Sequence, residues 1–194
     1  LGGLGTIQVF DPASGRHQII DGMGTCPGAA TAELWAEDFL GECPDGFGFI
    51  VKGNANELGR RAVTTPGIVA AFALAHRQFG RLPWSDLFAP AIRVAREGWP
   101  VRPHVAGVFA TNEAPYGRLP YIEKLRLTPD GTRLYLRPDG SAKRIGDIIR
   151  NPDLADTLAV LARDGADAFY TGEIAARIVA DQKAHGGLLS AADL

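Results

Sequence analysis

Two glycine-rich stretches near the N-terminus are the first residues of this chain whose types and spacing could do chemistry. One, Gly2-Gly3-Leu4-Gly5, leads into the extended run Ile7 to Asp11. A phosphate loop or a dinucleotide fingerprint needs its glycines after a strand and at the mouth of a helix, so this order excludes both. The other, Asp21-Gly22-Met23-Gly24-Thr25-Cys26-Pro27, ends a second extended run with small residues that let the backbone approach another group closely. This second stretch is a candidate edge of an active site.

The remaining reactive residue types form no pattern typical of catalysis or metal binding. No Gly-x-Ser-x-Gly elbow, no His-Glu-x-x-His motif and no second cysteine pair is present, so we expect no metal site and no cofactor in this chain. Cys26 and Cys43 leave a disulfide open, although free, buried thiols are favoured. Four histidines fall in separate elements, where we expect structural or surface roles: His17, His76, His104 and His185.

The elements that must position the second stretch begin with a hairpin over 6–21. Turn residues Pro12-Ala13-Ser14-Gly15 separate the two extended runs. Four helices are predicted further along the chain from their caps, prolines and apolar spacing. The first has Thr65 as its cap and Pro66 at N1, buries Val69, Phe72, Ala73 and His76, and ends at Gly80. The others run from near Pro90 to Gly98, from Asn151-Pro152 with Leu154, Leu158 and Leu161 buried to just before Gly165, and from Glu173 to Lys183 with Ile174, Ile178 and Val179 inward.

Two segments between these helices do not follow a helical period. Residues 111–131 predict a long connecting loop, in which Tyr116 and Tyr121 either line a pocket or, as is favoured, pack at the surface. Residues 133–146, with Leu134, Leu136 and the turn Pro138-Asp139-Gly140, predict a small surface hairpin.

Several blocks, in order along the whole chain, resemble the gamma-glutamyltranspeptidase family. They include Gly2-Gly3-Leu4-Gly5, Ile20-Asp21 with the loop ending at Pro27, and Val63-Thr64-Thr65-Pro66-Gly67-Ile68-Val69-Ala70. Later blocks are His76 with Phe79-Gly80-Arg81-Leu82-Pro83-Trp84, Pro90 to Gly98, Gly165 to Gly172, and His185 to Leu194. Accidental matches, and with them a stand-alone helical domain with no enzyme history, are disfavoured by this order.

The resemblance implies an N-terminal-nucleophile hydrolase, made as one precursor that cuts itself into a large and a small subunit. We therefore expect an α+β fold, part of a four-layer αββα sandwich, with this chain mostly helical after its N-terminal β-hairpin. Residues 1–194 match part of the large subunit as a single domain segment, with helical parts at 65–98 and 151–186. The chain opens on Leu1 and closes on a helix that Ser190 has barely begun, which also predicts a segment of something longer.

In this family the nucleophile is a threonine at the new N-terminus of the small subunit, so the resemblance places it outside this chain. Its hydroxyl attacks an amide carbonyl while its α-amine acts as base, and water or an amine resolves the acyl-enzyme. The expected partners are that small subunit and a small acyl amide. Twenty basic and twenty-two acidic residues, with no long apolar run, predict no nucleic-acid partner and no membrane span. The resemblance implies the cytoplasm or periplasm of a bacterium.

One position departs from the family in a way that bears on the substrate. Where glutamyl enzymes carry an arginine that grips the substrate α-carboxylate, this chain has Met23, followed by Gly24 and Thr25. A thioether cannot replace the planar fork of donors that arginine offers. We expect these three residues to contact the substrate, with an acyl group less anionic at that point, as in cephalosporin acylases or oxamate amidohydrolases.

Two alternatives stay open at this point. In the first, Met23 fills a gap in the core, and another cation, for instance Arg16 or Arg60, binds the substrate carboxylate. In the second, the chain is a non-catalytic homologue that keeps the fold as a binding or scaffolding protein. A threonine at the start of a second polypeptide separates this last alternative from an enzyme.

Overall fold

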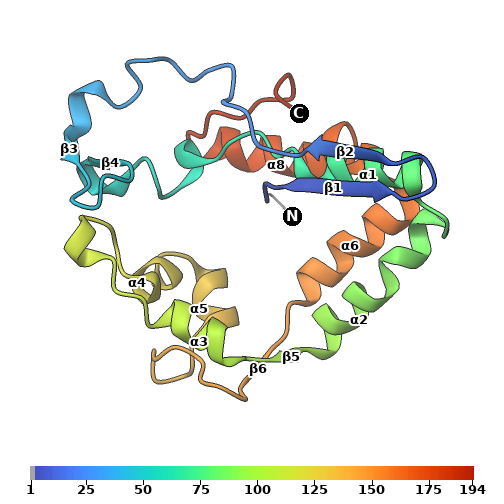
Figure 1. The fold of residues 1–194 in the computed structure, drawn as a ribbon. Helices are drawn as coiled ribbons and strands as arrows, with labels where there is room; N and C mark the ends of the chain where they lie inside the picture. The colour runs from blue at the N-terminus through green and yellow to red at the C-terminus, as the bar shows by residue number, and fades with distance from the viewer. Residues whose placement is uncertain (1–2) are drawn as a thin grey trace. The chain divides into compact units, whose positions relative to one another are not determined.

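The computed structural model of the protein describes residues 3–194, which fold as a mixed and mostly helical chain (Figure 1). The chain divides into two compact units. Unit 1 comprises Leu1–Thr31, Gly59–Ala89 and Thr157–Leu194, and unit 2 comprises Ala32–Leu58 and Pro90–Asp156. Helices α2 (Ala89–Glu97) and α6 (Pro152–Asp164) each cross the boundary along the chain.

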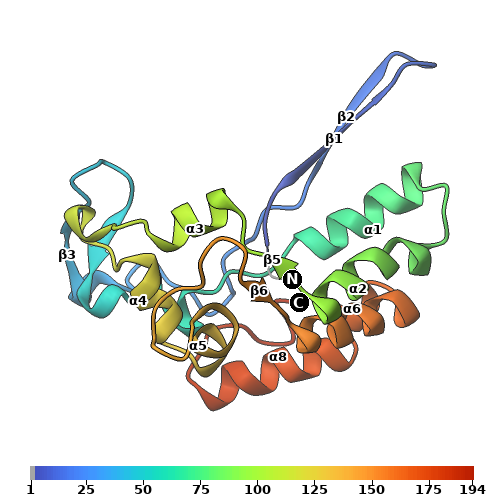
Figure 2. The same cartoon turned by 90° about the horizontal axis from the view of Figure 1, so that it is seen from below.

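Unit 1 opens with the predicted hairpin, in which β1 (Thr6–Asp11) and β2 (Arg16–Asp21) pair antiparallel from Thr6↔Asp21 to Asp11↔Arg16. Figure 2 shows them as a long two-stranded ribbon. The alternation of side chains turns Ile7, Val9 and Ile20 to one face, which is the more buried one. The other elements of unit 1 are helical: η3 (Arg60–Ala62), α1 (Ile68–Phe79), η4 (Trp84–Leu87), α7 (Asp167–Tyr170) and α8 (Glu173–Ala184).

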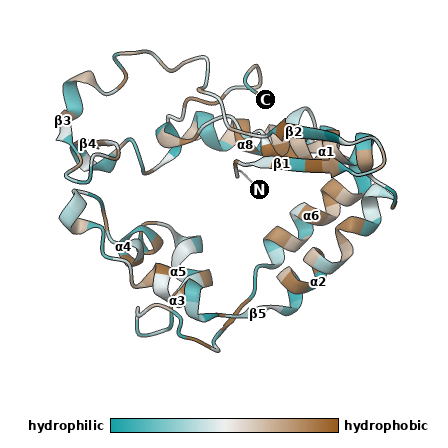
Figure 3. Ribbon diagram, viewed as in Figure 1, coloured by the Kyte–Doolittle hydropathy of each residue, from teal (hydrophilic) through white to brown (hydrophobic). Residues whose placement is uncertain are grey.

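The core of unit 1 joins helices that are far apart in the sequence. Val69 of α1, Leu161 of α6, Phe169 of α7 and Ile174 of α8 are buried against one another. Polar groups lock the same helices, because Trp84 Nε1 donates to the Leu161 carbonyl at 2.8 Å. The Tyr170 hydroxyl donates to the Pro66 carbonyl at 2.9 Å and accepts from the Ala70 amide at 3.0 Å. Hydrophobic residues recur between hydrophilic ones around α6, as its amphipathic sequence requires (Figure 3).

Unit 2 contains two short antiparallel pairs, β3 (Phe39–Glu42) with β4 (Phe49–Val51) and β5 (Trp99–Pro100) with β6 (Ile148–Ile149). Its small core gathers Val101, Phe109 and Ile149. The helical elements are η1 (Ala36–Asp38), η2 (Lys52–Asn54), α3 (Pro103–Phe109), η5 (Ala114–Tyr116), α4 (Tyr121–Arg126) and α5 (Pro129–Tyr135).

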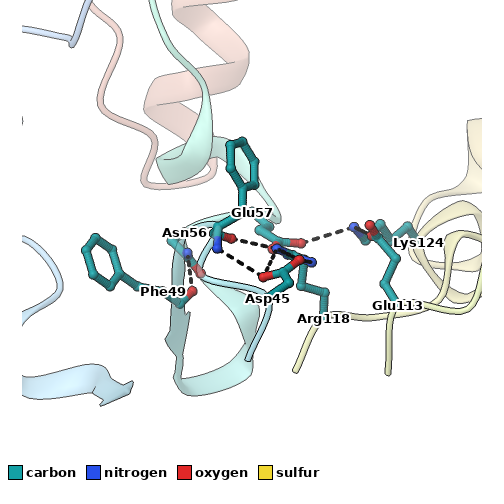
Figure 4. A network of polar contacts seen from close by, with 8 residues as sticks. Asp45, Phe49, Asn56, Glu57, Glu113, Arg118 and Lys124 are labelled. Atoms are coloured by element: carbon teal, nitrogen blue, oxygen red, sulfur yellow. Dashed lines mark hydrogen bonds and ion pairs between the residues drawn. The ribbon is translucent and has the colours of Figure 1, made fainter. Parts of the chain in front are cut away.

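A charge network holds residues 45–57 of unit 2 to residues 113–124 (Figure 4). The guanidinium of Arg118 is bidentate on Asp45, with N–O distances of 2.9 to 3.0 Å, and donates to the Phe47 carbonyl at 2.6 Å. Glu57 lies 3.5 Å from Arg118 Nε and accepts from Lys124 Nζ at 3.0 Å, and Lys124 also donates to Glu113 at 2.9 Å. Because the Arg118 side chain is only 11% exposed, the network belongs to the internal packing of unit 2.

The four helices predicted from the sequence are present, but the predicted start of α1 is wrong. The helix begins at Ile68, with Gly67 as an N-cap that makes no side-chain hydrogen bond. Thr65 is engaged elsewhere, because its backbone pairs with Thr25. Val69 and Ala73 are buried as predicted, whereas Phe72 is 50% exposed and Ala71 is buried in its place. The cause is the hairpin, since Ala71 faces Gly22 at the end of β2.

The prediction of a loop over 111–131 is also wrong, because η5, α4 and the start of α5 occupy it. Prolines that read as loop residues instead start helices: Pro120 is the N-cap of α4 and Pro129 is the first residue of α5, whose Thr128 cap accepts from the Gly131 amide at 3.0 Å. Tyr116 and Tyr121 are partly exposed, as the favoured interpretation has it, and each packs with a cation, Arg118 and Lys124.

The hairpin predicted over 133–146 is half right. Arg133–Tyr135 end α5, and only a single bridge, Leu136↔Ala142, flanks the turn at Pro138-Asp139-Gly140. The turn itself closes as expected, with the Gly140 amide donating to the Arg137 carbonyl at 2.9 Å.

Within residues 3–194, no helix has both the length and the apolar character that a membrane crossing needs.

Candidate functional site

The glycine-rich stretch after β2 forms a loop over residues 21–28, all of it in unit 1. Gly22 and Pro27 are buried, whereas Met23, Thr25 and Cys26 are exposed. The loop therefore displays a row of side chains from a main chain that is packed at both ends. We call it the 21–28 loop.

Close backbone contacts explain why the 21–28 loop needs its glycines. The Gly22 amide donates to the Gly5 carbonyl at 2.9 Å, and a Cβ at Gly22 would lie 2.8 Å from the Ala71 side chain. A Cβ at Gly24 would lie 2.5 Å from Thr64 Oγ1. A Cβ at Gly67 would lie 2.4 Å from the Met23 carbonyl oxygen, nearer than real Cβ atoms approach. Side chains at these three positions would push the loop away from the start of α1.

Hydrogen bonds fix the same main chain along its length. The Met23 amide donates to Asp21 Oδ1 at 2.9 Å, a local turn closed by a side chain. Thr25 and Thr65 exchange two backbone hydrogen bonds of 3.3 and 2.9 Å. At the far end, the Gly28 amide donates to Asp193 Oδ1 at 2.6 Å. The loop is thus pre-organised, as a recognition element needs to be.

Met23 projects from this loop with 48% of its surface exposed, and it fills no gap in the core of the described residues. Neither Arg16 nor Arg60, the two candidate cations for a substrate carboxylate, is both near Met23 and unpaired. Arg16 pairs with Asp11 at the opposite end of the hairpin, five residues and about 16 Å along β2 from Asp21. Arg60 is already bidentate on Asp181, through Nε at 3.0 Å and Nη2 at 3.1 Å.

Two carboxylates near the C-terminal end of unit 1, those of Asp181 and Asp193, are held by charged and polar groups. His185 Nδ1 lies 3.1 Å from Asp181 Oδ1, the carboxylate that also holds Arg60. The pKa of Asp181 is lowered, first by the hydrogen bond from Arg60 and further by the charge of that guanidinium. The pKa of Asp193 is also lowered, because its carboxylate accepts from the Gly28 amide and from Ser190.

The histidines and cysteines lie apart from one another and have separate surroundings. His76 Nε2 is held at 2.8 Å from the Leu82 carbonyl, and His185 packs on Asp181. Cys26 and Cys43 are both free; Cys43 is buried as expected, whereas Cys26 is exposed, so the expectation of burial is wrong for it. Among residues 3–194, no cluster of three or more His, Cys, Asp or Glu side chains is arranged to hold a metal ion.

Sequence reasoning found the 21–28 loop but missed what holds it. Gly67 is an ordinary residue type for a helix start, so its close approach to the Met23 carbonyl is visible only in the structure. The spacing Ser190 to Asp193 predicts a capping interaction, which the structure contains: Asp193 Oδ2 accepts from the Ser190 amide at 2.7 Å. Nothing local could reveal that the other oxygen of Asp193 reaches Gly28, since 165 residues separate them.

The chain is similar to proteins of one family throughout its length. The family model described as gamma-glutamyltranspeptidase matches residues 1–194. An acylase ACY 1 proenzyme from Pseudomonas sp. (strain SE83) is 32% identical over 195 residues, which cover the whole chain and 32% of the proenzyme. The chain therefore spans about a third of the length of that curated relative.

Solved structures agree with the sequence matches. Gamma-glutamyltranspeptidase of Helicobacter pylori superposes with a TM-score of 0.79 and 26% identity, over 99% of this chain and 50% of that one. Cephalosporin acylase of Bacillus halodurans superposes with a TM-score of 0.72 and 28% identity, over 97% of this chain and 32% of that one. The expectation of a mixed, mostly helical fold of the N-terminal-nucleophile type with an N-terminal hairpin is confirmed. The chain belongs to the gamma-glutamyltranspeptidase family.

Proposed function

We propose that residues 1–194 are a segment of the large subunit of an amide-bond acyl transferase or hydrolase, and that the 21–28 loop faces the acyl group. In this proposal Met23, Gly24 and Thr25 contact the substrate, and Met23 sets acyl specificity. The match of one family model to the entire chain supports the reaction class. The single observation that carries the substrate assignment is the exposed thioether on a fixed loop.

The chemistry follows from the family's nucleophile, which we place on a second chain cut from the same precursor. A threonine hydroxyl attacks the carbonyl carbon of the amide, and the threonine's own α-amine takes the hydroxyl proton. The C–N bond breaks, the amine leaves with that proton, and an ester joins the acyl group to threonine. Water then releases the acid, or an acceptor amine takes the acyl group.

The role of the present chain is to bind and orient the acyl part. A guanidinium at position 23 would select a carboxylate through two parallel hydrogen bonds, whereas Met23 offers contact without charge. We therefore infer an acyl group that is neutral or apolar where it meets this loop. The similarity to an acylase proenzyme and to a cephalosporin acylase supports that direction.

A gamma-glutamyl substrate remains the second candidate, because the similarity to Helicobacter pylori gamma-glutamyltranspeptidase is as extensive. It would need another cation at the loop. Two arginines could be considered for this role. Arg60 is already paired with Asp181, and Arg16 lies at the far end of the hairpin, so both are disfavoured.

The test is to substitute Met23→Arg in the complete enzyme and to compare turnover of a gamma-glutamyl anilide with turnover of neutral acyl anilides. A charged hydrogen bond contributes about 1.5 to 3 kcal/mol, so kcat/KM for the glutamyl substrate should rise roughly 10- to 100-fold. Met23→Leu is the matched control, because it keeps size and apolarity and should leave the preference unchanged. No gain with Met23→Arg would count against placing this loop at the acyl group.

A non-catalytic homologue is the alternative from a different class. It would bind an amide without turning it over and would yield no threonine-initiated second chain. The same preparations test this alternative, because a non-catalytic homologue would turn over no anilide and would not be processed, whereas an enzyme would do both.

A further inference from the structure

We infer that Asp193 is a positioning residue for the 21–28 loop: its carboxylate holds Gly28 and thereby fixes the main chain that displays Met23, Gly24 and Thr25. This inference rests on the proposed function of that loop. It assigns a role to a residue that is far from the loop in sequence and that acts through the loop.

The contacts of Asp193 divide between its two oxygens. Oδ1 accepts from the Gly28 amide at 2.6 Å, across 165 residues of sequence. Oδ2 accepts from both the amide and the hydroxyl of Ser190, each at 2.7 Å. Bonds to an ionised carboxylate are about twice as strong as neutral ones, and the lowered pKa of Asp193 keeps the group ionised at neutral pH. One oxygen therefore serves the loop while the other serves the turn that carries Asp193.

The turn that carries Asp193 is itself attached to the core of unit 1. Leu189 is 5% exposed, and its amide donates to Gln182 Oε1 at 3.3 Å. Gln182 is also 5% exposed and belongs to α8, whose Ile174 lies in the core cluster. The turn that carries the Asp193 carboxylate is thus held against α8 independently of the 21–28 loop.

The loop depends on this anchor at one end more than at the other. Its start is held by the Gly22–Gly5 bond and by the packing of Gly22 on Ala71, and its middle by the Thr25–Thr65 pair. After Thr25, the last residues of the loop are held by the burial of Pro27 and by the Gly28–Asp193 hydrogen bond. Without Asp193, residues 26–28 would sample more conformations and the end of the loop next to Thr25 would loosen, so fewer molecules would present Met23 and Thr25 together in the binding geometry.

Substrate affinity should reflect this loss, because apparent affinity falls with the fraction of molecules in the competent state. Asp193→Ala should raise KM for the acyl substrate about 10-fold while kcat changes by less than about two-fold. Asp193→Asn keeps a neutral oxygen for the Gly28 amide and should raise KM only about two- to three-fold. Ser190→Ala is the matched control: it removes one bond to the same carboxylate but spares Gly28, so KM should stay within about two-fold.

Hydrogen exchange at the Gly28 amide, read on a peptide that covers residues 22–31, tests the anchor without any turnover. We expect exchange about ten-fold faster or more in Asp193→Ala and unchanged in Ser190→Ala. If Gly28 exchanges at the wild-type rate in Asp193→Ala, the anchor does not exist. If exchange is faster but KM is unchanged, the anchor serves stability alone and the positioning role is overturned.

The two proposals fail in different ways. An unchanged substrate preference in Met23→Arg would remove the acyl assignment of the loop, and with it the kinetic role of Asp193, while the exchange result still decides whether the anchor exists. A preference that responds to Met23→Arg, together with equal KM values for Asp193→Ala and Ser190→Ala, would leave the proposed function standing and overturn only the role of Asp193. Asp193→Asn serves both measurements if Asp193→Ala does not fold.

Discussion

At the scale of single residues, the 21–28 loop shows how side-chain identity and backbone fit are separated. Met23 is free to vary because its side chain is exposed, whereas its carbonyl is fixed against Gly67. The side chain at position 23 can therefore change without disturbing the contacts that hold the loop. The glycines around it have the opposite property, since each is required by a close approach.

Gly67→Ala should expose this constraint. The new Cβ would lie 2.4 Å from the Met23 carbonyl oxygen and 3.0 Å from that of Gly22, so the backbone must shift. We expect a loss of about 1 to 3 kcal/mol in the free energy of unfolding, measured by urea denaturation. Gly107→Ala is the control: nothing lies within 4 Å of its Cβ inside α3, and it should stabilise by up to about 1 kcal/mol. Equal effects of the two substitutions would contradict the close approach.

Asp147 gives the protein a pH dependence that can be assigned to one carboxyl. Arg137 Nε donates to it at 2.8 Å and the Arg144 amide donates at 2.8 Å, and these bonds lower its pKa from 3.8 to about 2. A lowered native pKa stabilises the fold above the unfolded value of about 3.9, and the effect is lost as pH falls toward 2. Asp147→Asn should therefore be less stable than the native protein at pH 6, with a difference that shrinks below pH 4.

Urea midpoints at pH 6, 4 and 2 measure this dependence. Asp130→Asn removes an exposed carboxylate that pairs with Arg133 at 3.0 Å, and it should cost little at any of these pH values. A stability difference for Asp147→Asn that stays constant from pH 6 to pH 2 would show that the ion pair with Arg137 is not its cause.

At the scale of elements, unit 2 relies on charge where its hydrophobic core is small. The strands β3 and β4 are short, and several of their large apolar side chains, such as Phe39 and Phe49, are exposed. The network around Arg118 joins this hairpin to η5 and α4 (Figure 4). Removing Arg118 would leave Asp45 with only the Phe47 amide, 3.0 Å from Oδ1, and would leave Glu57 with only Lys124.

Arg118→Ala should lower the melting temperature by about 5 °C or more, since the bidentate pair with Asp45, the bond to the Phe47 carbonyl and the ion pair with Glu57 are lost together. Arg118→Lys should recover only part of this loss, because an ammonium cannot form the bidentate pair with Asp45. Arg96→Ala removes an exposed pair with Asp156 and should lower the melting temperature by less than about 2 °C. Similar losses for Arg118→Ala and Arg96→Ala, read by calorimetry, would show that the network contributes no more than a surface pair.

Elements with strong local signals were predictable from the sequence, and those shaped by distant contacts were not. The hairpin over 6–21 follows from its turn residues, and the bounds of α2, α6 and α8 follow from proline, glycine and apolar spacing. The start of α1 was misplaced because Thr65, a good cap by type, pairs with Thr25 instead. Residues 111–131 have no apolar period, since their short helices are held by charges and prolines.

The same division applies to the candidate site. The 21–28 loop and the absence of arginine at position 23 are visible in the sequence and in its resemblance to the family. The anchor at Asp193 is a tertiary contact, and the local Ser190–Asp193 spacing predicts only half of it.

At the scale of the whole molecule, the family relationship extends beyond the present chain. Residues 1–194 cover about half of the Helicobacter pylori chain and about a third of the acylase proenzyme. Unit 1 holds the 21–28 loop and the Gly28–Asp193 bond, and unit 2 holds the charge network around Arg118. Our proposal places the nucleophilic threonine on a second chain.

The most direct test is to express the complete reading frame, measure intact masses under denaturing conditions, and sequence the N-terminus of every species. We expect two chains from one precursor, the smaller one starting with threonine, and a single uncut precursor when that threonine is replaced by alanine. Such a result would establish self-processing and a competent nucleophile. A single unprocessed chain that turns over no acyl amide would contradict the proposed enzyme and leave a binding protein with the family's fold.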